Sequence, residues 1–151
     1  KAKFLLAGQL DSENPEAISE EQLRKWEVGG VVTWKGYQED MPKIFTNANI
    51  VVLPSYREGL PKVLLEAASC SRAIIASNVP GCREIVKNNK TGLLVPVKNS
   101  GALANAIEKL LKNPGLRKRL GKAARKLVIE KFSDEKVISR TLEIYKKLLR
   151  S

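Results

Sequence analysis

Five short apolar runs, each rich in β-branched residues or leucine, are the feature that most constrains the fold of this chain. They are KFLLAG (3–8), VVTWKG (31–36), IVVLPS (50–55), AIIASN (73–78) and GLLVPV (92–97). Segments of helical length separate the runs, and apolar strands that alternate with helices are typical of a parallel sheet covered on both faces. The pattern therefore predicts an α/β fold with a parallel β-sheet flanked by helices.

Three helices are expected between these runs, at residues 19–28, 40–48 and 61–71. The first has a capping-box spacing, because Gln22 follows Ser19 by three positions. The third begins with Pro61, which suits the first helical position because proline has no N–H to leave unpaired there.

From Gly101 onward the strand pattern stops and helical spacing replaces it. Pro114 and Gly115 separate two helices, and Ser133 is the expected N-cap of a last one. The apolar set of that last helix is Ile138, Leu142, Tyr145, Leu148 and Leu149. We therefore expect one domain over residues 1–151, with an α/β part at 1–98 and a helical C-terminal tail at 99–151.

Composition excludes several kinds of chemistry. The chain has 151 residues, of which 43% are hydrophobic, enough to fill one core. It has no histidine, and Cys70 and Cys82 form neither a disulfide framework nor a metal-ligand spacing. We therefore expect no metal, no cofactor and a reducing, cytoplasmic location. No apolar run approaches the roughly 18 residues that a membrane span requires.

The net charge of +11 lies entirely in the second half of the chain. Residues 1–69 carry a net charge of −2 and residues 70–151 a net charge of +13, with seven basic and no acidic side chains in 112–126. On a helix from about Leu116, the outward residues are Arg117, Lys118, Lys122, Arg125 and Lys126. A solvated helix face is the favoured interpretation; attraction to an anionic membrane surface or polyanion is the alternative.

Ligands of open parallel α/β sheets bind where the carboxyl ends of the strands meet the loops. Three loops qualify: Gly8-Gln9, Lys35-Gly36-Tyr37 and Ser55 to Pro61. The third is the richest, because Gly59 lets a ligand approach the backbone and a helix start points free N–H groups into the same space. This loop predicts a site for an anion, most simply a phosphate.

Two glutamates flank this helix start in the stretch PSYREGLPKVLLEA (54–67). Each has a structural interpretation: Glu58 could complement the helix dipole, and Glu66 could pair with Lys62 one turn earlier. Yet Glu66 stands among apolar residues, where a carboxylate is costly unless something binds it. Ionised carboxylates only accept hydrogen bonds, so sugar or ribose hydroxyls are natural partners.

The stretch PSYREGLPKVLLEA, the strand-containing AIIASNVPGCREIV and the segment NKTGLLVPV together resemble the donor-binding half of retaining GT-B glycosyltransferases of the large family four. The resemblance runs from about Lys3 to Leu149. It implies a Rossmann-like sheet, the C-terminal half of a GT-B fold. It joins an E-x7-E motif to several flanking pieces in the same order, which makes it specific.

The resemblance also implies roles for individual residues. Glu58 would lie beside the donor sugar near the reacting carbon, and Glu66 would hold the ribose hydroxyls. The remaining positions are Ser55, Arg57, Gly59, Leu60 and Pro61 at the donor sugar and diphosphate, Lys35, Gly36 and Tyr37 at the nucleobase, and Thr91 as a further candidate near the ribose or phosphates.

The implied reaction is transfer of a hexose or N-acetylhexosamine from a nucleotide sugar, expected to be a UDP-sugar, to a glycan or lipid-linked acceptor in bacterial polysaccharide or cell-surface glycan synthesis. In the mechanism favoured for such enzymes, the acceptor attacks the face from which the diphosphate leaves, without a metal. Peripheral contact with the inner face of the plasma membrane would suit the basic C-terminal region.

The family's donor half normally starts with one more strand and helix, which carry an Arg and a Lys of the diphosphate clamp, and an N-terminal acceptor domain precedes it. This chain starts after them, so we expect the 151-residue piece alone to be inactive. The alternatives are a nucleotide-sugar epimerase of the same architecture and a non-catalytic basic module that binds nucleic acid. Nucleic acid is the weaker choice, because aromatics are only 5% of the chain and do not alternate with the basic run.

Overall fold

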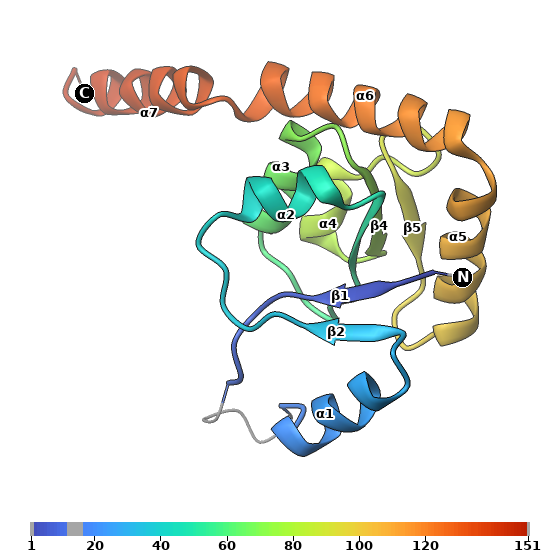
Figure 1. The fold of residues 1–151 in the computed structure, drawn as a ribbon. Coiled ribbons are helices and arrows are strands. Elements are labelled where there is room, and N and C mark those ends of the chain that lie inside the picture. Colours follow the sequence, from blue (N-terminus) through green and yellow to red (C-terminus); the bar gives the residue numbers. More distant parts are fainter. Residues whose placement is uncertain (1, 12–16, 151) are drawn as a thin grey trace. The chain divides into compact units, whose positions relative to one another are not determined.

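The computed structural model describes residues 2–11 and 17–150, and the chain divides into two compact units, Lys1–Met41 and Pro42–Ser151 (Figure 1). Both contain parallel β-structure, and the described residues form two strands in the first unit and three in the second.

The first unit consists of β1 (Phe4–Leu6), α1 (Glu20–Val28) and β2 (Val32–Trp34). The two strands pair in parallel, with Phe4 opposite Val32 and Leu6 opposite Trp34. Helix α1 begins as the sequence predicts, because the Gln22 amide donates a hydrogen bond to the Ser19 hydroxyl at 3.2 Å.

The second unit carries the larger sheet and most of the helices. The boundary helix α2 is Met41–Asn47, and the elements that follow are β3 (Ile50–Leu53), α3 (Lys62–Ser69), β4 (Ala73–Ser77), α4 (Pro80–Ile85), β5 (Leu93–Val95), α5 (Ser100–Lys112), α6 (Pro114–Phe132) and α7 (Asp134–Leu148). The sheet order is β3-β4-β5, all parallel, with Val51 opposite Ile74 and Ser77 opposite Val95. The carboxyl ends of all three strands therefore meet at one edge.

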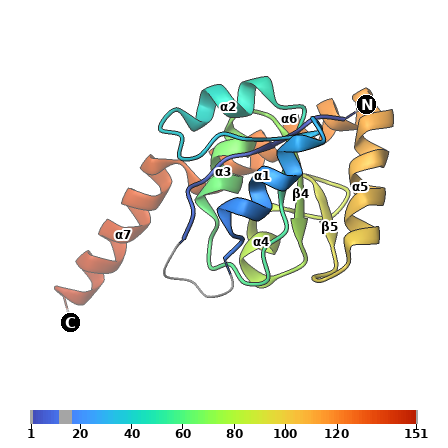
Figure 2. The same ribbon diagram turned by 60° about the horizontal axis from the view of Figure 1, so that its bottom comes forward.

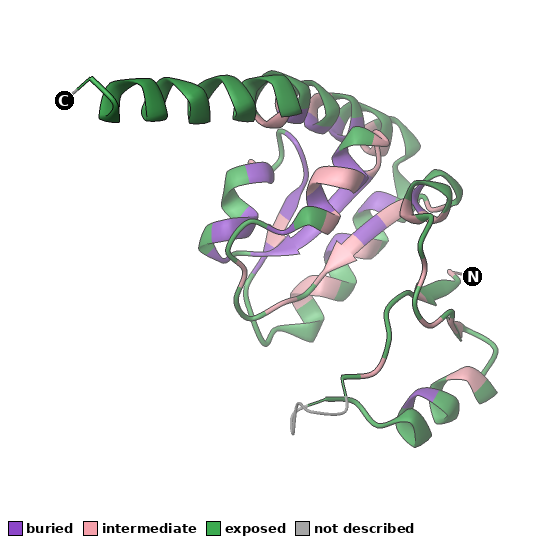
Figure 3. Cartoon of the chain, turned by 90° about the vertical axis from the view of Figure 1, so that its left-hand side faces the viewer, coloured by how far each residue is buried: buried purple, intermediate pink, exposed green. Residues whose placement is uncertain are grey.

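Strand β4 is the centre of this unit, and all five of its residues are buried (Figure 3). Ala73 and Ile75 share one core cluster with Leu110 of α5 and Leu120 of α6. Successive strand residues point to opposite faces, so Ile74, which is fully buried, belongs to the other face. Figure 2 shows α5 running beside β5, which places the start of α5 at the carboxyl edge of the sheet.

Helix α6 packs closely on the turn between α3 and β4. A β-carbon at Gly121 would lie 2.8 Å from the carbonyl carbon of Ser71, so only glycine allows this approach. Helix α7 differs from the other helices, because none of its residues is buried. Within the part of the chain that the structure describes, no helix is both long and apolar enough to cross a lipid bilayer.

The helices and strands predicted from the sequence are confirmed, and most of the observed elements are shorter than the predicted ranges. All five strands lie inside the predicted runs, and the helical tail starts at Ser100. One prediction is wrong by a residue: Pro61 is the N-cap of α3 and not its first helical residue, because its ψ of 109° is extended. The short helix α4 is an element that the pattern did not specify.

Candidate functional site

The loop from Ser55 to Pro61 leaves the carboxyl end of β3 and enters α3. Pro61 is buried, Ser55 and Glu58 are partly buried, and Arg57 and Leu60 are exposed. The loop is therefore anchored at its helical end and open in the middle. This is the arrangement expected of a segment that binds a ligand at the edge of a parallel sheet.

The N-terminus of α3 supplies unpaired backbone donors to this loop. The Leu64 amide donates to the Pro61 carbonyl at 3.0 Å. The amides of Lys62 and Val63 have no acceptor among the described residues. Two N–H groups at the positive end of a helix form a suitable contact for an anionic oxygen.

Gly81 of α4 holds the other side of the loop. A β-carbon at this position would lie 2.5 Å from the Glu58 carbonyl oxygen and 2.6 Å from the Gly59 carbonyl carbon. The backbone of the loop thus rests directly on α4, where any side chain would push it away. The position of Glu58 depends on this close approach.

The carboxylate of Glu58 is available to a ligand. It has no hydrogen bond or ion pair with another described residue. The neighbouring Cys82 is fully buried, and burial, followed by the negative charge of Glu58, raises the pKa of its thiol. A partly buried acid with no partner, next to an inert thiol, can accept hydrogen bonds from hydroxyl groups.

Glu66 has a different environment. Its side chain is 31% exposed and lies 3.5 Å from the Lys62 ammonium group, which is 87% exposed. Such a pair on a helix surface contributes only a few tenths of a kcal/mol, roughly 0.3–0.5. The structural interpretation of Glu66 is thus realised, but the pair is weak and solvated enough for a ligand hydroxyl to replace Lys62.

The predicted nucleobase loop belongs to the first unit. Lys35 follows β2 and donates its amide to the Leu6 carbonyl at 2.9 Å, while the Gly36 carbonyl accepts from the Gly8 amide at 2.8 Å. Gly36 has a φ of +62°, which glycine adopts without strain. Tyr37 is 66% exposed. The backbone is thus fixed and the tyrosine ring is free to contact a flat ligand.

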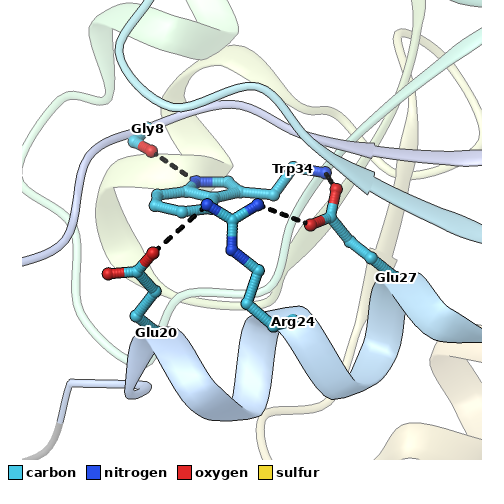
Figure 4. Close-up of polar contacts among 5 residues, drawn as sticks. All are labelled: Gly8, Glu20, Arg24, Glu27 and Trp34. Carbon is cyan, nitrogen blue, oxygen red and sulfur yellow. Dashed lines mark hydrogen bonds and ion pairs between the residues drawn. The ribbon is translucent and has the colours of Figure 1, made fainter.

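A polar cluster that the sequence analysis missed supports this loop (Figure 4). The Arg24 guanidinium pairs with Glu20 at 3.2 Å and Glu27 at 3.1 Å, and lies 5.2 Å from the centroid of the Trp34 ring. The Trp34 indole N–H donates to the Gly8 carbonyl at 2.9 Å. The cluster ties α1 to the ends of both strands.

Glu27 is the central acceptor of this cluster. It accepts the Trp34 amide at 2.9 Å, and this hydrogen bond, together with the nearby Arg24, holds its pKa below the ordinary value. The alternating E-x3-R-x2-E spacing in α1 was a signal for the helix pairs. The contact with Trp34 had no sequence signal, because it joins a helix to the following strand.

Thr91 has a structural role in the turn between α4 and β5. Thr91 is buried. Its hydroxyl donates a hydrogen bond to the Ile85 carbonyl at 2.8 Å, and the same oxygen accepts one from the Lys87 amide at 2.8 Å. The hydroxyl closes the turn between α4 and β5 by donating one hydrogen bond and accepting another. The predicted position of Thr91 near the ribose or phosphates stays a prediction.

The basic helix α6 uses three arginines to fix its own surroundings. Arg117 donates to the Leu110 carbonyl at 2.6 Å, Arg125 donates to the Ser69 carbonyl, and Arg119 lies 3.4 Å from the Asn89 carbonyl. These contacts support the interpretation of a solvated, structural helix face. The exposed lysines of the helix make no hydrogen bond of this kind to a backbone carbonyl of the described residues.

The described residues contain no group of three or more histidine, cysteine, aspartate or glutamate side chains placed to hold a metal ion. The loop itself offers one unpaired carboxylate, two free helix amides and a glycine-lined backbone. Parallel sheets flanked by helices, with a loop at the carboxyl edge that can bind an anion and a helical tail, define an α/β fold with a candidate ligand site.

Comparison with known proteins assigns the chain to a family. The family described as "Glycosyl transferases group 1" matches residues 1–127, and the chain belongs to this family. It is 37% identical over 151 residues to an N,N'-diacetylbacillosaminyl-diphospho-undecaprenol alpha-1,3-N-acetylgalactosaminyltransferase of Campylobacter jejuni. The match covers 100% of this chain and 39% of that relative.

Two solved structures are similar in fold to this chain. Sucrose-phosphate synthase from Thermosynechococcus elongatus has a TM-score of 0.86 and 33% identity, over 97% of this chain and 38% of that one. A TarM of S. aureus, solved with UDP among its ligands, has a TM-score of 0.82 and 26% identity, over 95% of this chain and 29% of that one. The predicted family and the GT-B type of fold are thereby confirmed. The chain spans well under half the length of these proteins.

Proposed function

We propose that this chain is the donor-binding part of a retaining glycosyltransferase that uses a UDP-sugar and transfers a hexose or N-acetylhexosamine to a glycan or lipid-linked acceptor. The observation that carries the proposal is the donor loop itself. Its unpartnered Glu58 rests on Gly81, beside two free amides at the start of α3. The Campylobacter relative acts on a lipid-linked diphosphate, and TarM was solved with UDP, which supports these choices.

In this proposal the diphosphate lies at the N-terminus of α3. The amides of Lys62 and Val63, with Gly59 and Leu60 of the loop, donate to its oxygens, and the dipole of α3 stabilises the negative charge that develops on the leaving group. Fixed donors of this kind need no reorganisation during the reaction. No metal ion is required for this step.

The two glutamates bind opposite ends of the donor. Glu58 accepts hydrogen bonds from the sugar hydroxyls and stabilises positive charge at the anomeric carbon, while Glu66 exchanges its Lys62 partner for the ribose hydroxyls. The acceptor oxygen then attacks on the face from which the diphosphate departs. A phosphate oxygen of the leaving group takes the acceptor proton, in keeping with the absence of histidine from the sequence.

The test is a titration of the full-length protein with UDP-, GDP- and ADP-sugars, for the wild type, Glu58→Ala and Glu66→Ala. Glu66→Ala should weaken binding of every nucleotide with the same ribose by about 1–3 kcal/mol, because ribose hydroxyls lose their acceptor. Glu58→Ala should mainly reduce transfer. Glu130→Ala, an exposed acid on α6, is the matched control. Unchanged binding and turnover in both loop variants would reject the site.

A further inference from the structure

A second hollow lies at the same edge of the sheet, where β3, β4 and β5 end and α5 begins. Its volume is about 460 Å³, within the range of small-molecule sites. It adjoins the donor loop through Tyr56 but contains neither Glu58 nor Glu66.

Ser77, the last residue of β4, lines this hollow and is only 2% exposed. Its hydroxyl has no hydrogen bond with another described residue. Among the described residues, no fully covered side-chain oxygen or nitrogen lacks a partner, so the little exposure that Ser77 retains includes its hydroxyl oxygen. Buried polar groups are nearly always hydrogen-bonded, and this one faces a space where a ligand could satisfy it.

The start of α5 makes the hollow electropositive. Asn99 caps the helix by accepting the Ala102 amide at 2.8 Å. The amides of Ser100 and Gly101 have no acceptor among the described residues. The ammonium group of Lys98 lies 5.4 Å from the centroid of the Tyr56 ring. None of the lining residues is acidic, so an anion would meet a helix dipole and a cation with no opposing charge.

The rest of the lining indicates what the anion is attached to. Val95 and Leu103 provide apolar surface, and Tyr56 and Ser100 provide hydroxyl groups. A bare phosphate would leave this surface uncovered, whereas a sugar ring offers both C–H faces and hydroxyls. We propose that the hollow binds a phosphorylated sugar, with its phosphate at Ser77, Lys98 and the start of α5, and its ring against Tyr56 and Leu103.

Calorimetric titration of the full-length protein with glucose 6-phosphate, inorganic phosphate and glucose tests this. Glucose 6-phosphate should bind about tenfold more tightly than inorganic phosphate, and glucose should not bind measurably. Ser77→Ala and Lys98→Gln should each weaken glucose 6-phosphate about fivefold or more, as expected for the loss of a hydrogen bond to a charged group. Lys90→Gln, an exposed lysine that does not line the hollow, should bind like the wild type.

Stability supplies a second readout. Because the Ser77 hydroxyl is unpaired, Ser77→Ala should leave the melting temperature of the ligand-free protein unchanged or raise it, whereas a hydroxyl with a structural partner would lower it on removal. The inference is rejected if glucose 6-phosphate does not bind, if inorganic phosphate binds as tightly, or if the two hollow variants match Lys90→Gln. UDP-glucose titrated in parallel separates the two sites, since Lys98→Gln should retain its affinity for that donor.

Discussion

The peptide carbonyl of Gly59 packs against the α-carbon of Gly81. A β-carbon added at Gly81 would lie only 2.6 Å from the Gly59 carbonyl carbon, so there is no room for one. This contact couples a ligand loop after β3 to a helix after β4, which are separate in sequence. It fixes the height of the loop above the sheet edge. Glu58, one residue before Gly59, is aimed by the same contact.

Gly81→Ala should therefore disturb both folding and donor binding. The added methyl group meets backbone atoms that cannot rotate away, so we expect a loss of about 1–3 kcal/mol in the free energy of unfolding, measured by urea denaturation. Affinity for the donor nucleotide sugar should fall in the same variant. Gly115→Ala is the control, because its β-carbon would have only an ordinary contact of 3.5 Å with Asn113; its stability should not decrease. Wild-type stability in Gly81→Ala would contradict the contact.

The Glu27 contact predicts a pH dependence in the first unit. The pKa of Glu27 in the folded protein is lowered from its ordinary value of 4.5, so the stability it contributes is present above 4.5 and is lost as the pH falls through the lowered value. The chemical shift of the Trp34 backbone amide, followed by NMR during acid titration, should move with that transition.

Glu27→Gln should abolish that pH-dependent shift, because the amide cannot ionise. Glu21→Gln is the matched control: Glu21 pairs with Lys25 at 2.7 Å on the exposed side of α1, and its loss should leave the Trp34 titration in place. A Trp34 amide that titrates in Glu27→Gln as in the wild type would show that another group is responsible.

Thr91 can be tested by the contrast between valine and serine. Thr91→Val removes the hydroxyl and leaves the Ile85 carbonyl and the Lys87 amide without their partner, which should cost about 1–3 kcal/mol of unfolding free energy. Thr91→Ser keeps the hydroxyl and should cost less. If the hydroxyl only closes this turn, the folded Thr91→Val and Thr91→Ser proteins should bind the donor equally well, and a clear loss of donor affinity in Thr91→Val alone would place the hydroxyl at the donor.

The basic side chains of α6 should fall into two classes, which differ in how much they contribute to the free energy of unfolding. Arg125→Ala removes the hydrogen bond to the Ser69 carbonyl and should reduce the unfolding free energy by about 0.5–1.5 kcal/mol. Lys126→Ala loses only a 3.8 Å surface pair with Glu130 and should be nearly neutral, within about 0.5 kcal/mol. Thermal denaturation of the two variants at the same salt concentration measures both losses of stability. Equal losses would show that Arg125 and Lys126 do not differ in their structural role.

Sequence reasoning succeeded where the determining interactions are local. The run AIIASN predicted β4, and the spacing of Ser19 and Gln22 predicted the start of α1, because strand pattern and helix capping depend on neighbours in sequence. Pro61 was placed one residue too far into α3. Proline fixes φ but not ψ, and its extended ψ makes it the cap.

Contacts between distant segments had no such signal. Nothing in the stretch NVPGCREI indicates that Gly81 supports Glu58, since the requirement for glycine arises only when the loop after β3 folds over α4. The run AIIASN likewise carries no signal that singles out Ser77. Its unpaired hydroxyl became evident only once β5 and α5 were placed beside it.

Helix α7 has a consequence for how the chain unfolds. Its apolar side chains, among them Val137, Ile138 and Leu142, are about half exposed, and none of its residues is buried. A helix of this length is marginal in water without tertiary contacts. Its unfolding is therefore uncoupled from that of the sheet, and its amide protons should exchange with solvent at low protection while those of β4 exchange only when the whole unit opens.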